Sequence, residues 1–210
     1  MNSKTHWQDI YTQKDSKQLS WFQEHAKMSL QVIKKNVQNK NAQIIDIGAG
    51  ASTLVDDLLQ SGYRNIDVLD ISSEALQISQ RRIKTLQIDA KINWIQTNIL
   101  EADFPQHHYD TWHDRAVFHF LTKQQEREQY IQKLMHTLKP GGKVIISTFG
   151  PDGPLECSGL PIVRYSHDSL HNEFGLAFEL LEHGEEEHQT PSGSIQKFIY
   201  CYCKLNNKKH

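Results

Sequence analysis

Short apolar runs alternate with longer segments in which apolar residues recur every three or four positions. The apolar runs predict strands at residues 44–47, 66–70, 92–97, 109–114, 143–149, 178–183 and 197–204. The three- and four-residue spacing predicts helices over 26–37, 54–59, 76–86 and 124–138, with a shorter helix over 168–174. Strands that alternate with helices indicate an α/β fold built on a parallel sheet.

The segment from Ile44 to Thr53 predicts a buried strand, a glycine loop and the start of a helix. Gly48 and Gly50 stand two positions apart, where the chain has to turn sharply and leave its backbone open to a ligand. Gly62 is placed to end the following helix, and Asp70 ends the next apolar run. This order is typical of a nucleotide-binding half-fold, in which the acid accepts hydrogen bonds from a ribose.

Two positions indicate which nucleotide binds. A dinucleotide fingerprint has a third glycine where this chain has Thr53, and Asp46 stands two residues before the first glycine. A carboxylate there disfavours a pyrophosphate and favours a ligand with cationic groups. The motif Asp-x-Gly-x-Gly-x-Ser, with an acid after the second strand, resembles the class I (Rossmann-like) S-adenosylmethionine-dependent methyltransferases of the small single-domain type. Their cofactor carries an ammonium and a sulfonium group and no phosphate.

The sequence Leu-Lys-Pro-Gly-Gly at residues 138–142, between a helix and an apolar strand, also resembles this family. The resemblance implies a three-layer Rossmann-like sandwich around a mostly parallel seven-stranded sheet with an antiparallel last strand. It also implies one methyltransferase domain over residues 1–210. Residues 1–40 would form an N-terminal helical or lid segment, and residues 150–175 a substrate-side loop and short helix.

The resemblance further implies that the cofactor is S-adenosyl-L-methionine, with S-adenosyl-L-homocysteine as product. The expected cofactor-binding residues are Asp46, Gly48, Ala49, Gly50, Asp70, Ile71, Asn98, Ile99, Trp21 and Tyr11. Asn98 departs from the family, which commonly has an acid there, although its amide oxygen can accept the same hydrogen bond. Ile71 and Ile99 either flank the adenine or simply pack in the core. Likewise, the N-terminal aromatic residues either close over the cofactor or cover one end of the core.

A dense group of titratable residues follows the fourth predicted strand. His113, Asp114 and His119 are candidates for removing a proton from the acceptor. Arg115, Arg164 and Tyr165 are candidates for binding the substrate, with either arginine pairing with an anion. Ligands of open α/β sheets bind beyond the carboxyl ends of the strands, which places this segment at the site.

The composition is that of an ordinary globular protein with a net charge of −2, which gives no reason to expect nucleic acid as a partner. No apolar run approaches the ~20 residues of a membrane span, and the three cysteines fit no disulfide or zinc pattern. We therefore expect a cytoplasmic protein with a small-molecule substrate, no membrane partner, and a monomeric or weakly dimeric state. No metal is expected, because His167 and His171 share a helix face without a third ligand.

Several alternatives stay open. A protein methyltransferase acting on lysine is the second hypothesis, because the N-terminal aromatic residues resemble those of some small lysine methyltransferases. A non-catalytic S-adenosylmethionine-binding protein is the third. An NAD(P)-dependent oxidoreductase is disfavoured by Thr53 and Asp46.

Overall fold

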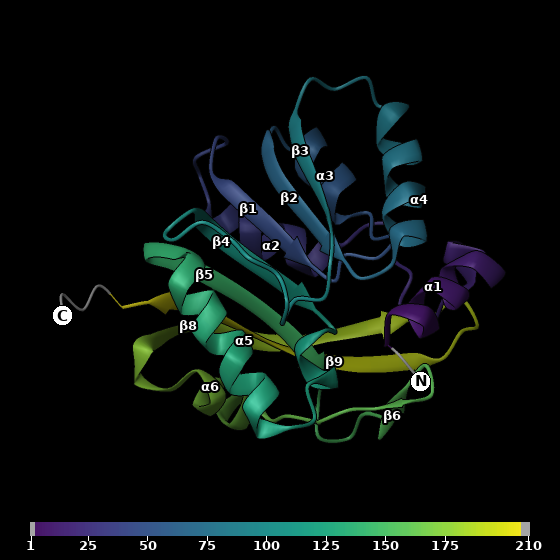
Figure 1. Cartoon of the computed structure of the whole chain (residues 1–210). Coiled ribbons are helices and arrows are strands. Elements are labelled where there is room, and N and C mark those ends of the chain that lie inside the picture. The colour runs from purple at the N-terminus through teal and green to yellow at the C-terminus, as the bar shows by residue number, and fades with distance from the viewer. Residues whose placement is uncertain (1–2, 207–210) are drawn as a thin grey trace. The chain divides into compact units, whose positions relative to one another are not determined.

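The computed structural model describes residues 3–206 and has an α/β fold with a seven-stranded, mostly parallel sheet (Figure 1). The predicted fold class is confirmed. The chain divides into two compact units, which are described separately below. Unit 1 comprises residues 1–102 and 189–194, and unit 2 comprises residues 103–188 and 195–210.

Unit 1 contains three parallel strands in the order β3-β2-β1. Its elements are α1 (Ser3–Gln13), the 3-10 helix η1 (Ser16–Gln18), α2 (Lys27–Asn36), β1 (Gln43–Ile47), α3 (Leu54–Gln60), β2 (Asn65–Asp70), α4 (Ser73–Lys84) and β3 (Lys91–Gln96). Four of the five β1 residues are buried, which fits a central parallel strand covered on both faces. Helix α4 packs against β2 and β3, and α1 lies against α4 (Figure 1).

Unit 2 contains strands in the order β4-β5-β9-β8. Its elements are β4 (Tyr109–Arg115), η2 (Phe118–Phe120), α5 (Gln124–Thr137), β5 (Leu138–Phe149), the short hairpin β6 (Glu156–Cys157) and β7 (Leu160–Pro161), α6 (His167–Phe174), η3 (Gly175–Ala177), β8 (Phe178–Gln189) and β9 (Ile195–Leu205). Strand β4 is parallel to β5, whereas β9, the last strand of the chain, is antiparallel to β5. The antiparallel last strand is as predicted.

Several helix ends follow from local sequence. Gly62 has φ +93° just after α3, as its role as a helix stop requires. The Ser72 hydroxyl accepts a hydrogen bond from the Ala75 amide and caps α4. Helix α5 begins at Gln124, as predicted, and the Glu126 carboxylate accepts a hydrogen bond from the amide of Lys123, the residue before the helix.

The structure adds three details that the apolar pattern alone did not give. Residues 185–187, three glutamates that suggest a turn after the predicted strand at 178–183, lie within the twelve-residue strand β8, where half-buried and exposed residues alternate. Their acidity masked a period of two, which is the stronger strand signal. Helix α1 lies within residues 1–40, the segment expected to be helical or a lid, although its few apolar residues form no clear stripe among polar ones. The irregular stretch from residue 150 to 161 contains the β6–β7 hairpin.

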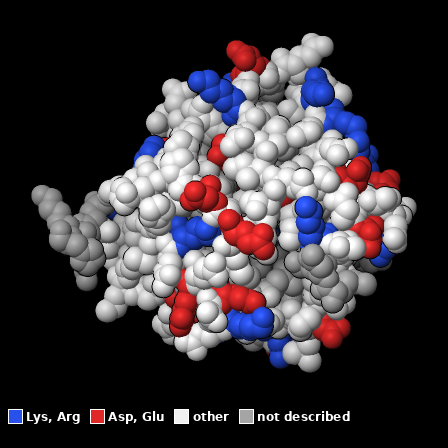
Figure 2. Space-filling model, viewed as in Figure 1, with Lys and Arg blue, Asp and Glu red and all other residues white. Residues whose placement is uncertain are grey.

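On the face shown in Figure 2, basic and acidic side chains are interspersed. This distribution fits the small net charge of the sequence. Among residues 3–206, no helix is both long and apolar enough to cross a bilayer.

Candidate active site

The glycine loop after β1 has the conformation that its sequence predicts. Gly48 and Gly50 have φ values of +58° and +56°, which L-residues with a side chain rarely adopt. A Cβ atom added to Gly50 would overlap the hydroxyl group of Tyr11. The loop therefore needs glycine at position 50 for both its conformation and its close packing.

Asp70 lies at the carboxyl end of β2 and faces this loop. Its Oδ2 accepts a hydrogen bond from the Gly50 amide at 2.7 Å, and its Oδ1 accepts one from the Ser72 amide at 2.7 Å. Asp70 is 6% exposed, and this burial raises the pKa of its carboxyl to about 6 although the backbone hydrogen bonds lower it. Each oxygen of the Asp70 carboxylate can accept a further hydrogen bond, so this side chain fits the two hydroxyls of a ribose.

The N-terminal segment contacts the same loop. Tyr11 is buried, and its hydroxyl accepts a hydrogen bond from Trp21 Nε1 at 3.2 Å. Gln8 Oε1 accepts hydrogen bonds from the hydroxyls of Ser72 and Ser73, which fastens α1 to the start of α4. The structure thus brings Tyr11 to the glycine loop and Trp21 to Tyr11, whereas the closing of these N-terminal aromatic residues over a ligand stays a prediction.

The other predicted cofactor residues of unit 1 are mostly buried. Asp46 on β1 is 2% exposed, Ile99 is buried and Ile71 is half-buried. Asn98 Oδ1 accepts a hydrogen bond from the Leu100 amide at 3.0 Å and so stabilises the turn after β3. That oxygen has a second lone pair, so an additional bond from an adenine amine is compatible with this turn.

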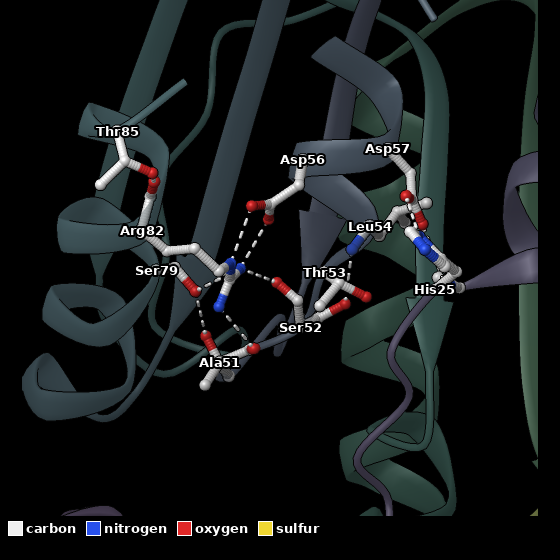
Figure 3. A network of polar contacts seen from close by, with 12 residues as sticks. His25, Ala51, Ser52, Thr53, Leu54, Asp56, Asp57, Ser79, Arg82 and Thr85 are labelled. Carbon is white, nitrogen blue, oxygen red and sulfur yellow. Dashed lines mark hydrogen bonds and ion pairs between the residues drawn. The ribbon is translucent and has the colours of Figure 1, made fainter. Parts of the chain in front are cut away.

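Arg82 also contributes to this region, although Arg81, Arg82 and Lys84 together have the pattern of a solvated helix face. Figure 3 shows it reaching from α4 to the carboxylate of Asp56 on α3. Its Nε and Nη2 lie 2.8 and 2.6 Å from the two Asp56 oxygens. The guanidinium also donates to the carbonyl oxygens of Ala51 and Ser52, the residues that follow the glycine loop. Arg82 therefore fixes the path of the chain from the glycine loop into α3.

A second carboxylate on α3 fixes the chain that precedes α2. Asp57 Oδ2 accepts a hydrogen bond from the Ala26 amide at 2.9 Å, and Oδ1 lies 2.8 Å from His25 Nδ1 (Figure 3). The hydrogen bond to Asp57 raises the pKa of His25. Neither contact follows from an apolar pattern, because both depend on tertiary pairing.

In unit 2, Asp114 organises the end of β4. Its Oδ2 accepts from the Tyr130 hydroxyl at 2.6 Å, and its Oδ1 accepts from the Val117 amide at 2.9 Å. Trp112 Nε1 donates to the same tyrosine hydroxyl at 2.8 Å. Burial raises the pKa of Asp114 to about 6. Both oxygens of this candidate base are thus already hydrogen-bonded, which favours a positioning role for the turn.

His119 and Arg115 share an aromatic environment. The His119 ring is buried and stacks on Phe149 with 5.2 Å between ring centres and 3° between planes. Burial lowers the pKa of His119 to about 3, so its imidazole is neutral at physiological pH. The Arg115 guanidinium lies 4.3 Å from the centre of the Phe198 ring, and its Nε lies 3.1 Å from Glu186 Oε2.

The remaining predicted residues of unit 2 have separate surroundings. His113 is buried on β4. Arg164 is exposed and donates from Nη1 to the Gly153 carbonyl at 3.1 Å. Tyr165 is buried and contacts Phe118, with 5.9 Å between ring centres. Their substrate contacts stay predictions.

The histidines of α6 bind backbone groups. His167 Nε2 lies 3.0 Å from the Gly184 carbonyl oxygen, and His171 Nε2 lies 3.1 Å from that of Phe178. Within residues 3–206, no three His, Cys, Asp or Glu side chains are grouped so that they could hold a metal ion.

Comparison with known families decides what kind of domain surrounds the glycine loop. Residues 44–142 match the family described as "Methyltransferase domain". These residues form a methyltransferase domain. The matched region begins in β1 and ends in β5, so it includes the glycine loop, Asp70 and Asp114. The resemblance noted in the sequence is confirmed for this domain.

Known proteins similar to the methyltransferase domain have different acceptors. Malonyl-[acyl-carrier protein] O-methyltransferase of Halalkalibacterium halodurans is 29% identical over 152 residues, which are 70% of this chain and 49% of that protein. EEF1A lysine methyltransferase 2 of Homo sapiens is 22% identical over 195 residues, 87% of this chain and 76% of that protein. The chain spans about half the length of the malonyl-specific relatives that it matches.

Solved structures have the same fold as this protein. An S-adenosylmethionine-dependent methyltransferase of Anabaena variabilis superposes with a TM-score of 0.74 at 17% identity, over 98% of this chain and 96% of the other. At this identity the likeness supports the fold alone.

Proposed function

We propose that this protein is an S-adenosylmethionine-dependent methyltransferase that acts on a small-molecule acceptor. The observation that carries the proposal is the glycine loop of a methyltransferase domain facing the buried carboxylate of Asp70. When bound, S-adenosylmethionine supplies an electrophilic methyl group on a sulfonium.

The residues of unit 1 have distinct roles in this proposal. Asp70 accepts hydrogen bonds from the ribose hydroxyls, and Asp46 holds the ammonium group directly or through water. Gly48, Ala49 and Gly50 leave their backbone accessible to the methionine arm. Ile71, Ile99 and Asn98 contact the adenine, and Tyr11 and Trp21 exclude water from the bound cofactor.

Methyl transfer is an in-line displacement in which charge is lost, so alignment of the reactants supplies much of the rate. The acceptor contacts in this proposal come from His113, His119, Arg115, Arg164 and Tyr165. Asp114 accepts hydrogen bonds from the Val117 amide and the Tyr130 hydroxyl, and so fixes the turn between β4 and η2, the 3-10 helix that contains His119. A neutral His119 contributes a hydrogen bond rather than a strong base.

A protein lysine methyltransferase is the second candidate. The coverage of the human lysine methyltransferase, 87% of this chain, favours it. Lysine as acceptor requires removal of a proton from its ammonium group, and His119, whose pKa burial lowers to about 3, does not accept that proton at neutral pH. A small acceptor is therefore the first candidate.

The test is turnover of the purified protein with S-adenosylmethionine. Formation of S-adenosylhomocysteine would be followed with small acids, phenols, amines and thiols, and in parallel with eEF1A protein. Turnover with a small acceptor supports the proposal, and turnover with eEF1A alone supports the second candidate. Binding of S-adenosylhomocysteine without turnover on either set would indicate a non-catalytic binder.

We further propose that residues 1–210 act as one methyltransferase domain in a reducing, cytoplasmic compartment. The three cysteines form no disulfide, which fits such a compartment. A monomeric or weakly dimeric state would be checked by light scattering.

A further inference from the structure

In unit 2, buried polar atoms without a partner gather around one pair of aromatic rings. Arg115 Nη2, His119 Nδ1 and His119 Nε2 are buried and make no hydrogen bond to any part of the chain that the structure describes. Buried polar groups of folded proteins are nearly always paired, so these three atoms are candidates for contacts with a bound water, ion or ligand. We call Arg115, His119, Phe149 and Phe198 the Arg115 cluster.

The two phenyl rings of the Arg115 cluster pack against its guanidinium and its imidazole. Phe149 stacks on Phe198 with 4.4 Å between ring centres. His119 stacks on Phe149, and the Arg115 guanidinium lies over Phe198. Arg115 ends β4 and Phe149 ends β5, which are parallel neighbours, so the cluster lies at the edge of the sheet where α/β folds bind ligands.

The chemistry of the Arg115 cluster is that of a donor and not of a base. His119 is neutral, because burial lowers its pKa to about 3. Cys157 packs against the apolar cluster of Phe149, Ile162 and Phe198, and burial raises the pKa of its thiol, so the thiol stays protonated at neutral pH. Glu186 is already paired with Arg115 Nε at 3.1 Å. The cluster therefore offers N–H groups of a guanidinium and of a neutral imidazole, and it suits an acceptor that is ionised before it binds.

We propose that the methyl acceptor is a carboxylic acid, bound as its carboxylate by Arg115 Nη2 and the N–H of His119. Its apolar body would lie against the phenyl rings. This inference rests on the proposed function and names its acceptor class. A carboxylate oxygen lone pair forms the new bond to the methyl carbon, and the carbon–sulfur bond breaks with its electrons moving to sulfur. The products are a methyl ester and S-adenosylhomocysteine, and no proton is transferred.

Amines, phenols and thiols fit this cluster less well. Each is mostly protonated at neutral pH and has to lose a proton for methylation. Neither His119 nor Cys157 in its buried state can accept that proton at neutral pH. A carboxylic acid is already ionised and pairs directly with a guanidinium.

The experiment compares acids with their own amides. Phenylacetate, octanoate and malonyl-pantetheine would each be assayed beside the corresponding primary amide with methyl-labelled S-adenosylmethionine. Calorimetric binding of each compound to the protein saturated with S-adenosylhomocysteine is the second readout. Methyl esters release volatile methanol in alkali, whereas N- and S-methyl products do not. We expect the acid to bind and to give an alkali-labile methylated product. The corresponding amide should neither bind nor be methylated.

Two variants separate a ligand-binding arginine from a structural one. Arg115→Gln should raise the KM for the acid at least about tenfold, because a buried charge pair with the substrate is lost. Glu186→Gln keeps Arg115 and removes its competing partner, so it should lower the KM several-fold. Arg81→Gln on the exposed face of α4 is the control and should leave the KM for the acid unchanged. Circular dichroism would report whether each variant folds.

Three results would overturn the proposal. They are an alkali-stable product, equal use of acid and amide, and a higher KM in Glu186→Gln. Failure to bind or methylate any acid in the panel, while another acceptor class is methylated, overturns it as well and leaves the proposed function intact. If S-adenosylhomocysteine itself does not bind, the proposed function fails first, and the acceptor proposal fails with it.

Discussion

Replacing Asp70 by asparagine should separate the fold from cofactor binding. The carboxylate is buried, and burial raises its pKa from about 4 in the unfolded chain to about 6 in the folded one. This pKa difference of about two units corresponds to about 3 kcal/mol. The ionised carboxylate at pH 7 therefore lowers the free energy of unfolding by about that amount, compared with a pH at which it is protonated in both states. Asparagine carries no charge and removes that cost.

Asparagine also loses an interaction. Its amide NH₂ would face either the Gly50 or the Ser72 N–H, each of which now donates to a carboxylate oxygen at 2.7 Å. One lost charge-assisted hydrogen bond costs about 1–3 kcal/mol. Because the two effects nearly offset, we expect the unfolding free energy of Asp70→Asn at pH 7 to lie within about 2 kcal/mol of wild type. Affinity for S-adenosylhomocysteine should fall by about 10- to 100-fold.

The pH dependence gives an independent check. A carboxyl whose pKa is raised on folding binds more protons in the folded state, so stability falls as the pH rises from about 4 to about 6. The fall should be smaller in Asp70→Asn, with the remainder due to groups such as Asp114, whose pKa is raised in the same direction.

Urea unfolding at several pH values and calorimetry with S-adenosylhomocysteine would measure these effects, with exposed Asp89→Asn as control. The reasoning is refuted if Asp70→Asn keeps wild-type affinity. A loss of stability well above about 3 kcal/mol with unchanged pH dependence would refute it too.

Three further predictions concern stability. Arg82→Met leaves the Asp56 carboxylate unpaired and should lower the free energy of unfolding in urea by about 2–3 kcal/mol. The exposed control Arg81→Met should change it by less than about 0.5 kcal/mol, and equal effects would contradict the contacts in Figure 3. Gly50→Ala should lose about 1–3 kcal/mol, and a double-mutant cycle with Tyr11→Phe should show partial recovery, since the added methyl overlaps the tyrosine hydroxyl; additive effects would argue against that overlap. Tyr130→Phe leaves Trp112 Nε1 and Asp114 Oδ2 without their shared partner and should cost about 3 kcal/mol, with affinity for S-adenosylhomocysteine unchanged; a loss of affinity would show that this hydroxyl also acts on the cofactor.

Much of the fold follows from local pattern. The strand, glycine loop, helix, strand and acid from Ile44 to Asp70 were predictable, because buried parallel strands are continuous apolar runs and a loop with positive φ requires glycine. The strand at residues 178–189 was predicted too short, since its three consecutive glutamates suggest a turn although every second residue is half-buried.

The contacts that shape the candidate site were less predictable. Arg82 and Asp56 lie 26 positions apart and pair only after α3 and α4 have packed. Gln8 meets Ser72 across 64 positions, and nothing near either residue in the sequence indicates that contact. The neutral state of His119 is likewise a consequence of burial, whereas its sequence neighbours suggested a base.

The most direct test of the account is a crystal structure of the protein with S-adenosylhomocysteine. We predict that both ribose hydroxyls lie within hydrogen-bonding distance of the Asp70 carboxylate and that the amino-acid arm passes the backbone of Gly48 and Gly50. Adenosine bound elsewhere, or NADH binding in that place while S-adenosylhomocysteine does not, would contradict it.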